Sequence, residues 1–185
     1  MQWKNSDNAY GVLSKTIHWL MALCILGMFV GGVVMHGMEK SPLKWQLYAF
    51  HKSMGLSLLI LVFVRIIWHI FSPTPSLGQI KKPVIRKGAK AGHRTLYFFM
   101  LLLPISGWIM SCASGYIPNF WGVMQWSLPI SKNKTLSSIF HWMHMNMAWL
   151  FMAIVAVHIT MALWHHYYYK DSTLVRMLPG LEKRH

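Results

Sequence analysis

The segment "FHWMHMNMAWLFMAIVAVHITMALWHH", residues 140–166, decides the fold of this chain. It is apolar and long enough to cross a bilayer, which takes about 20 helical residues. It also contains five histidines: His141, His144, His158, His165 and His166. Ionisable side chains within a membrane span are costly and usually functional. The question is therefore what these imidazoles bind.

Three other apolar segments have a similar length, so the predicted spans are about 17–36, 50–71, 94–113 and 144–166. Lipid offers no hydrogen-bond partners, so a spanning segment is a helix or a strand of a closed barrel. Long unbroken apolar runs favour helices. The sequence predicts an all-α membrane protein, a four-transmembrane-helix bundle, with residues 1–185 in one domain. Segment 114–138 is expected to fold over the outer face with a short interfacial helix.

The composition agrees with a membrane protein: 55% of residues are hydrophobic, 12% are charged and the formal net charge is +14. In a membrane protein such charge usually reflects loops that face anionic lipid. Attraction of a small anion is the alternative. No nucleic-acid-binding motif accompanies the charge, so nucleic acid is not an expected partner. Cys24 and Cys112 lie in apolar runs and are expected to be small core residues.

The basic residues also predict the orientation. Twelve lysines and arginines lie in the N-terminal segment, in 72–94 and in the tail. The positive-inside rule therefore places both termini in the cytoplasm. The opposite side carries five lysines, which are Lys40, Lys44, Lys52, Lys132 and Lys134.

This topology places four histidines at two depths. His18 and His158 lie at cytoplasmic depth, and His51 and His144 lie near the other face. His144 and His158 are 14 residues apart, which is about 21 Å along a helix. Their directions differ by only about 40°, so they share one helix face. The predicted pairs are His18 with His158 and His51 with His144.

Paired imidazoles on facing helices of a bundle are typical ligands of low-spin haem. The sequence contains no Cys-x-x-Cys-His, so we expect non-covalent haem b. Two haems about 20 Å apart would form an electron path across the membrane. Zinc fits less well, because the four histidines lie at two levels rather than around one point. His141, three residues before His144, could replace it as a ligand, although its direction differs from that of His158 by about 100°. His36, His69 and His93 are expected to be interfacial.

Several motifs together resemble the bacterial cytochrome b561 family. They are "IHWL" (17–20), "FHKSMG" (50–55), "PTP" (73–75), "GHRTLYFFMLLLPISGW" (92–108), "HMNMAWLFMAIVAVH" (144–158) and "HHYYYKDSTLVRMLP" (165–179). The resemblance implies a four-helix protein of the bacterial inner membrane with two haem b groups. It implies His18, His51, His144 and His158 as axial ligands, and it favours His144 over His141 because the family's two ligands on this helix are also 14 residues apart. It further implies electron exchange with ubiquinone. One activity known in the family is oxidation of periplasmic superoxide.

Arg65 lies inside a span at cytoplasmic depth, where it suits a haem propionate; snorkelling to the interface is the alternative. His165 and Lys170 could supply a hydrogen bond and a proton to a quinone carbonyl. The alternative is an interfacial histidine and a snorkelling lysine. The five lysines of the outer side oppose only Glu39. Their field would raise the encounter rate of superoxide. The alternative is that they are ordinary loop lysines. Lys52 is the strongest candidate for such a role, because it follows the proposed ligand His51.

The leading hypothesis is therefore a di-haem b ubiquinone oxidoreductase with superoxide as a candidate electron donor. A second hypothesis is an electron-transfer membrane subunit that docks to a separate redox partner protein and has no substrate of its own. A metal transporter that uses His and Met is the third, and the lack of acidic residues within the spans supports it poorly.

Overall fold

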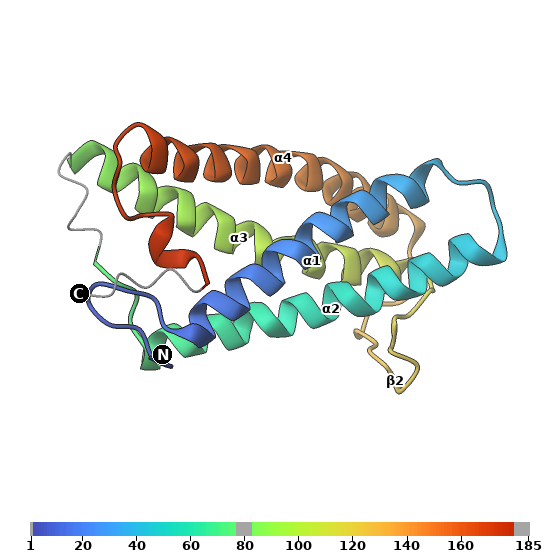
Figure 1. The fold of residues 1–185 in the computed structure, drawn as a ribbon. Coiled ribbons are helices and arrows are strands. Elements are labelled where there is room, and N and C mark those ends of the chain that lie inside the picture. The colour runs from blue at the N-terminus through green and yellow to red at the C-terminus, as the bar shows by residue number, and fades with distance from the viewer. Residues whose placement is uncertain (1, 77–82, 180–185) are drawn as a thin grey trace.

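Four long helices make up most of the molecule (Figure 1). The computed structural model describes residues 2–76 and 83–179. The helices are α1 (Val12–Gly37), α2 (Pro42–Phe71), α3 (Pro83–Ala113) and α4 (Lys134–Tyr167), followed by a short 3-10 helix, η1 (Val175–Met177). Each of the four is long and apolar enough to cross a membrane. The predicted four-helix architecture is confirmed, although some basic residues used for the orientation, in 77–82 and 180–185, lie outside the described residues.

The helices extend beyond the apolar segments because hydropathy marks only the part that crosses lipid, whereas the backbone stays helical to a capping residue. The Ser41 side chain accepts a hydrogen bond from Lys44 N (3.2 Å), with Pro42 at the first helical position. The Asn133 side chain accepts one from Leu136 N (2.9 Å). Both are favoured helix starts. α3 begins at Pro83, well before the predicted start at 94.

The bundle has two distinct ends. α3 packs against α4, and α2 packs against both α1 and α3. Figure 1 shows the N-terminus, the C-terminal segment and the start of α3 at one end, which we name the terminal end. The α1–α2 connection and the β-strands lie at the other, which we name the hairpin end. The core at the α1–α2 contact is formed by Ile17, Met21 and Val62.

The outward surfaces of the helices are apolar. Large side chains such as Leu23 (68% exposed), Ile70 (70%) and Val157 (63%) point away from the bundle. In water such a continuous apolar surface would favour aggregation, whereas lipid tails solvate it. The exposure pattern therefore agrees with a protein that spans a membrane.

Segment 114–133 forms a small hairpin, so the expected interfacial helix is wrong. β1 (Asn119–Phe120) pairs antiparallel with β2 (Met124–Gln125). Gly115 (φ +83°), Trp121 (φ +52°) and Gly122 (φ +76°) have left-handed backbone conformations, which interrupt a right-handed helix. The segment does lie at one end of the bundle (Figure 1), and that this end is the outer face stays a prediction.

Two serines of α2 hold this hairpin in place. Ser53 Oγ accepts a hydrogen bond from Trp121 N (3.1 Å) and donates to Asn119 O (3.2 Å). Ser57 Oγ accepts from Trp121 Nε1 (3.0 Å). The hairpin therefore lies against the part of α2 that follows His51.

Candidate functional site

The structure brings together the four histidines that the sequence pairs. The His18 ring of α1 faces the His158 ring of α4, with centroids 6.4 Å apart and an interplanar angle of 62°. The His51 ring of α2 faces the His144 ring of α4, also at 6.4 Å, with an angle of 77°. α4 therefore contributes one imidazole to each of two pairs at two levels of the bundle.

The ring spacing in each pair leaves room for a metal ion between the two imidazoles. An imidazole nitrogen lies about 2.0 Å from a bound metal ion, and a five-membered ring with bonds of about 1.33 Å has its centre about 1.1 Å from each atom. Two imidazoles on opposite sides of one ion would therefore have centres about 6.2 Å apart. A direct hydrogen bond between the rings would reduce this to about 5.2 Å. The observed 6.4 Å at both pairs is longer than the hydrogen-bonded spacing and leaves room for one metal ion between the two rings.

The surroundings suit a large apolar group rather than a bare ion. A cavity of about 250 Å³ reaches between all four helices at the level of His51 and His144, and its other lining residues are mostly Met, Leu, Val, Phe and Gly. Within residues 2–76 and 83–179, no cluster of three or more His, Cys, Asp or Glu could hold a metal ion. Two imidazoles in an apolar cavity are the donor set of bis-histidine haem, so the residues at the level of His51 and His144 fit that group.

His144 has a fixed tautomer. Its Nδ1 lies 3.1 Å from Leu103 O and 3.0 Å from Ser106 Oγ. Ser106 Oγ itself donates to Leu103 O (2.7 Å), so Nδ1–H is the donor to these oxygens. Nε2 is then the unprotonated nitrogen, as metal binding requires. Gly107 permits the close approach of the ring, since a Cβ at this position would lie 3.0 Å from His144 Cε1.

At the other pair, His18 contacts Arg65. Both terminal nitrogens of the guanidinium lie 3.3 Å from His18 Nδ1, and Nε donates to Tyr97 Oη (3.0 Å). A guanidinium only donates hydrogen bonds, so this contact requires an unprotonated Nδ1. Across the two described stretches of the chain, no carboxylate is within ion-pair distance of Arg65. Arg65 is therefore a cation within a span, and the hydrogen-bond acceptors of its guanidinium are all neutral.

His93 belongs to the same cluster, which the sequence argument did not anticipate. Its ring centroid lies 5.6 Å from that of His158, with an interplanar angle of 66°. Residue 93 was assigned to the interface because the apolar segment begins at 94. The helix in fact begins at Pro83, which places His93 well inside α3. A polar helical extension before an apolar segment is the signal that could have revealed it.

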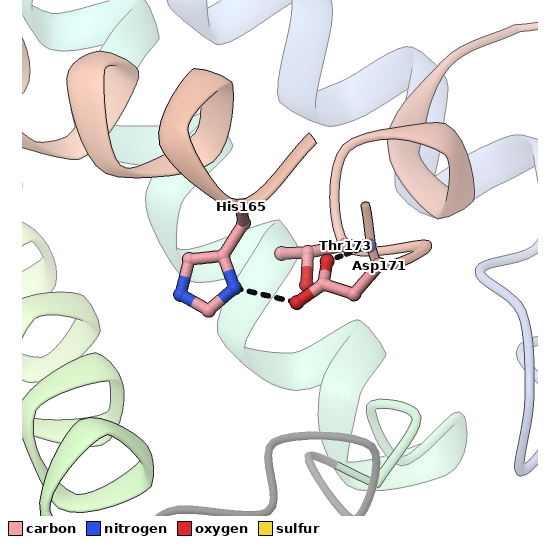
Figure 2. Close-up of polar contacts among 3 residues, drawn as sticks. All are labelled: His165, Asp171 and Thr173. Atoms are coloured by element: carbon pink, nitrogen blue, oxygen red, sulfur yellow. Dashed lines mark hydrogen bonds and ion pairs between the residues drawn. The ribbon is translucent and has the colours of Figure 1, made fainter. Parts of the chain in front are cut away.

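His165 faces the carboxylate of Asp171, with Thr173 beside it (Figure 2). His165 is buried (5% exposed), and its Nδ1 lies 2.5 Å from Asp171 Oδ2. Asp171 Oδ1 accepts from Thr173 N (2.9 Å). Burial alone would raise the pKa of the Asp171 carboxyl, but hydrogen bonds from Thr173 and His165 outweigh it and hold that pKa below its usual value. Lys170 is exposed, with a left-handed φ of +50°.

The segment after α4 folds back under the terminal end. Trp19 Nε1 donates to Met177 O (2.8 Å), and Arg176 donates to Ser76 O (3.2 Å). The His165–Asp171 contact lies at the turn where this segment leaves α4. It therefore covers the end of the bundle that contains His18 and His158.

Two of the five outer lysines converge on one short segment. Lys52 Nζ donates to Tyr116 O (2.9 Å) and lies 5.7 Å from the centre of the Tyr116 ring. The Lys132 side chain runs along Gly115, within 3.4 Å of the position of a Cβ there. Lys44 Nζ donates to Met38 O (2.5 Å). Lys40 and Lys134 are exposed.

The other histidines are placed as follows. His141 is exposed and lines the same cavity as His36, whereas the ring that faces His51 is that of His144. This geometry favours His144 over the alternative, His141. His69 Nδ1 lies 3.5 Å from Ser72 O, where α2 ends.

Comparison with known proteins gives a consistent result. The family model described as prokaryotic cytochrome b561 matches residues 9–180. Cytochrome b561 homolog 2 of Escherichia coli K12 is 32% identical over 180 residues, which cover 96% of this chain and 95% of that protein. The probable superoxide oxidase CybB of Yersinia pestis is 28% identical, covering 92% of this chain and 96% of that protein. Cytochrome b561 homolog 1 of E. coli K12 is 31% identical, covering 90% and 96%. With its four spanning helices, the chain therefore belongs to the prokaryotic cytochrome b561 family of haem b electron-transfer proteins in the bacterial inner membrane.

Proposed function

We propose that the chain is a di-haem b ubiquinone oxidoreductase that takes electrons from superoxide at the hairpin end and delivers them to ubiquinone at the terminal end. The observation that carries the proposal is the pair of 6.4 Å ring spacings, one at each level of the bundle. The positive-inside argument assigns the terminal end to the cytoplasm and the hairpin end to the periplasm.

Four imidazoles would hold the two haems: His18 with His158, and His51 with His144. When bound, haem b supplies reversible one-electron storage at each level. Leu103 and Ser106 orient His144, because an acceptor on Nδ1–H keeps Nε2 as the ligand.

Arg65 would compensate a haem propionate at the cytoplasmic level. Ligation of His18 through Nε2 leaves a proton on Nδ1, and Arg65 then has no acceptor on that ring. The hydroxyl of Tyr97 and the sulfur of Met21 are the other acceptors in reach. A propionate carboxylate would accept two hydrogen bonds from the guanidinium. In the snorkelling alternative, the guanidinium would have to leave both Tyr97 and Met21.

At the periplasmic end, the lysines would attract superoxide. Lys52 and Lys132 flank residues 115–116 beside the hairpin, so their charges add at one place. An anion approaching this end would be steered in a salt-dependent way. Each superoxide loses one electron and leaves as O₂. The family relative described as a probable superoxide oxidase motivates this choice of donor.

At the cytoplasmic end, His165 would donate to the quinone. Two electrons, from two superoxide anions, and two protons from the cytoplasm convert one ubiquinone to ubiquinol. Asp171 holds Nδ1 of His165, so the ring can pass a proton through Nε2 while Asp171 stabilises its charged form. Lys170, exposed beside this turn, would contact the quinone headgroup or the lipid interface.

The test is superoxide-driven reduction of a water-soluble ubiquinone analogue by the purified, haem-loaded protein. The proposal predicts quinol formation with one quinol for every two superoxide anions, at a rate that falls with added salt. His51→Ala should abolish it, and Lys87→Gln on the exposed surface of α3 is the matched control. If haem is reduced only when a separate redox protein is added, the chain is instead a partner-dependent electron-transfer subunit.

A further inference from the structure

We propose that the protein surroundings give the two histidine pairs different reduction potentials, with the higher potential at His18 and His158, so that electrons run from the hairpin end to the terminal end. This inference rests on the proposed function, since it assumes one haem at each pair. It adds the order of the two reduction potentials, which would drive that electron flow, and the residues that set this order.

Two cationic side chains lie near the terminal pair, His18 and His158. The Arg65 guanidinium lies 3.3 Å from His18. Lys15, one helical turn before His18, is only 6% exposed. A cation in a low-dielectric site stabilises the state with one more electron. Both residues therefore raise the potential of a haem at this level.

The surroundings of the hairpin pair lower the reduction potential of a haem at that level. His144 Nδ1–H donates to Leu103 O (3.1 Å), and Ser106 Oγ lies 3.0 Å from the same nitrogen. Such acceptors make the imidazole a stronger electron donor to the metal. A stronger donor stabilises the oxidised iron, and therefore lowers the potential of a haem at this level.

The hairpin pair has a cation of its own, since Lys52 follows His51 and lines the same cavity, where its ammonium donates to Tyr116 O and lies over the Tyr116 ring. The terminal pair has two, Arg65 in contact with His18 and the buried Lys15, so the larger positive charge lies at the terminal pair. Each haem brings its own propionates, so their negative charge is the same at both levels. Arg65 adds its positive charge at the terminal pair whether it faces His18 or a propionate. The asymmetry thus comes from this chain's residues.

The test is a redox titration of the loaded protein, followed by the visible spectrum, with haem counted per chain. His158→Ala and His144→Ala assign each midpoint to a pair. Arg65→Gln should lower the higher midpoint potential by at least about 59 mV, which corresponds to a tenfold change in the equilibrium constant of a one-electron couple. The lower midpoint potential should be unchanged. Arg65→Lys, which keeps the charge, should restore most of the shift, and Lys87→Gln should move neither.

Ser106→Ala is the complementary variant, because it removes one acceptor from His144 without altering any charge. It should raise the lower midpoint alone. If Arg65→Gln fails to retain haem, Lys15→Gln removes a charge from the same end and should lower the higher midpoint in the same sense. Equal shifts of both midpoints, or a higher midpoint assigned to His144, would overturn the inference. Fewer than two haems per chain in the unaltered protein would instead refute the proposed function, and the order of potentials with it.

Discussion

Gly107 provides a sharp test of the hairpin-level site, because its missing side chain leaves room for the His144 ring. An added Cβ would lie 3.0 Å from His144 Cε1 and 3.2 Å from Nδ1, where ordinary contacts begin at 3.4 Å. In Gly107→Ala the ring must therefore retreat by about 0.4 Å, the difference between 3.4 and 3.0 Å. The hydrogen bonds of Nδ1 at 3.0 and 3.1 Å resist this movement, or break.

Overpacking of this kind costs about 1–3 kcal/mol, which corresponds to a loss of about 5- to 150-fold in affinity for a group held by His144. The assay is haem content per chain during titration of the haem-free protein with haem b. One of two binding events should weaken by this factor and the other should be unchanged. Gly27→Ala is the matched control, since an added Cβ there meets nothing within 4 Å.

Equal weakening of both binding events would show that Gly107 acts on the fold as a whole. Unchanged binding of both haems in Gly107→Ala would refute the placement of His144 as a ligand held between α3 and the haem.

Two further predictions concern the ends of the bundle. Lys52→Gln should lower the superoxide-dependent rate several-fold at low salt and flatten its salt dependence, because one positive charge is removed from the field that attracts the anion. Stopped-flow rates at a series of salt concentrations measure both effects. An unchanged salt dependence would exclude Lys52 from steering the anion. Asp171, whose carboxyl pKa lies below its usual value of 3.8, stabilises the folded-back C-terminal segment above that value, and this stabilisation is lost as pH falls through the lowered pKa. Limited proteolysis should therefore show faster cleavage within 168–179 in strong acid, and already at neutral pH in Asp171→Asn; equal cleavage of the variant and the unaltered protein at neutral pH would contradict the role of the His165–Asp171 contact.

The sequence predicts the helical architecture and the grouping of the histidines well, because both follow from periodicities that are local. A span needs a run of apolar residues, and two positions 14 apart on one helix share a face wherever that helix packs. The depths of His18 and His51 then follow from the alternating direction of the helices. No long-range information is needed for these steps.

The residues around the histidines are less predictable, since they depend on how the helices pack and where they end. His93 was missed because hydropathy placed the start of the helix at 94, whereas the backbone is helical from Pro83. The contact of Ser106 with His144 and the closeness of Gly107 depend on the rotation of α3 against α4. The hairpin was missed for a different reason: left-handed conformations at Gly115 and Gly122 mark a turn, but the local sequence does not reveal its pairing.

The most direct test of the central claim is the dithionite-reduced minus oxidised spectrum of the purified protein, with haem counted per chain, in the unaltered protein and in His158→Ala. The account predicts two low-spin b haems per chain in the first and one in the second, with the haem at His51 and His144 retained. No haem in the unaltered protein, or two haems per chain in His158→Ala, would contradict it.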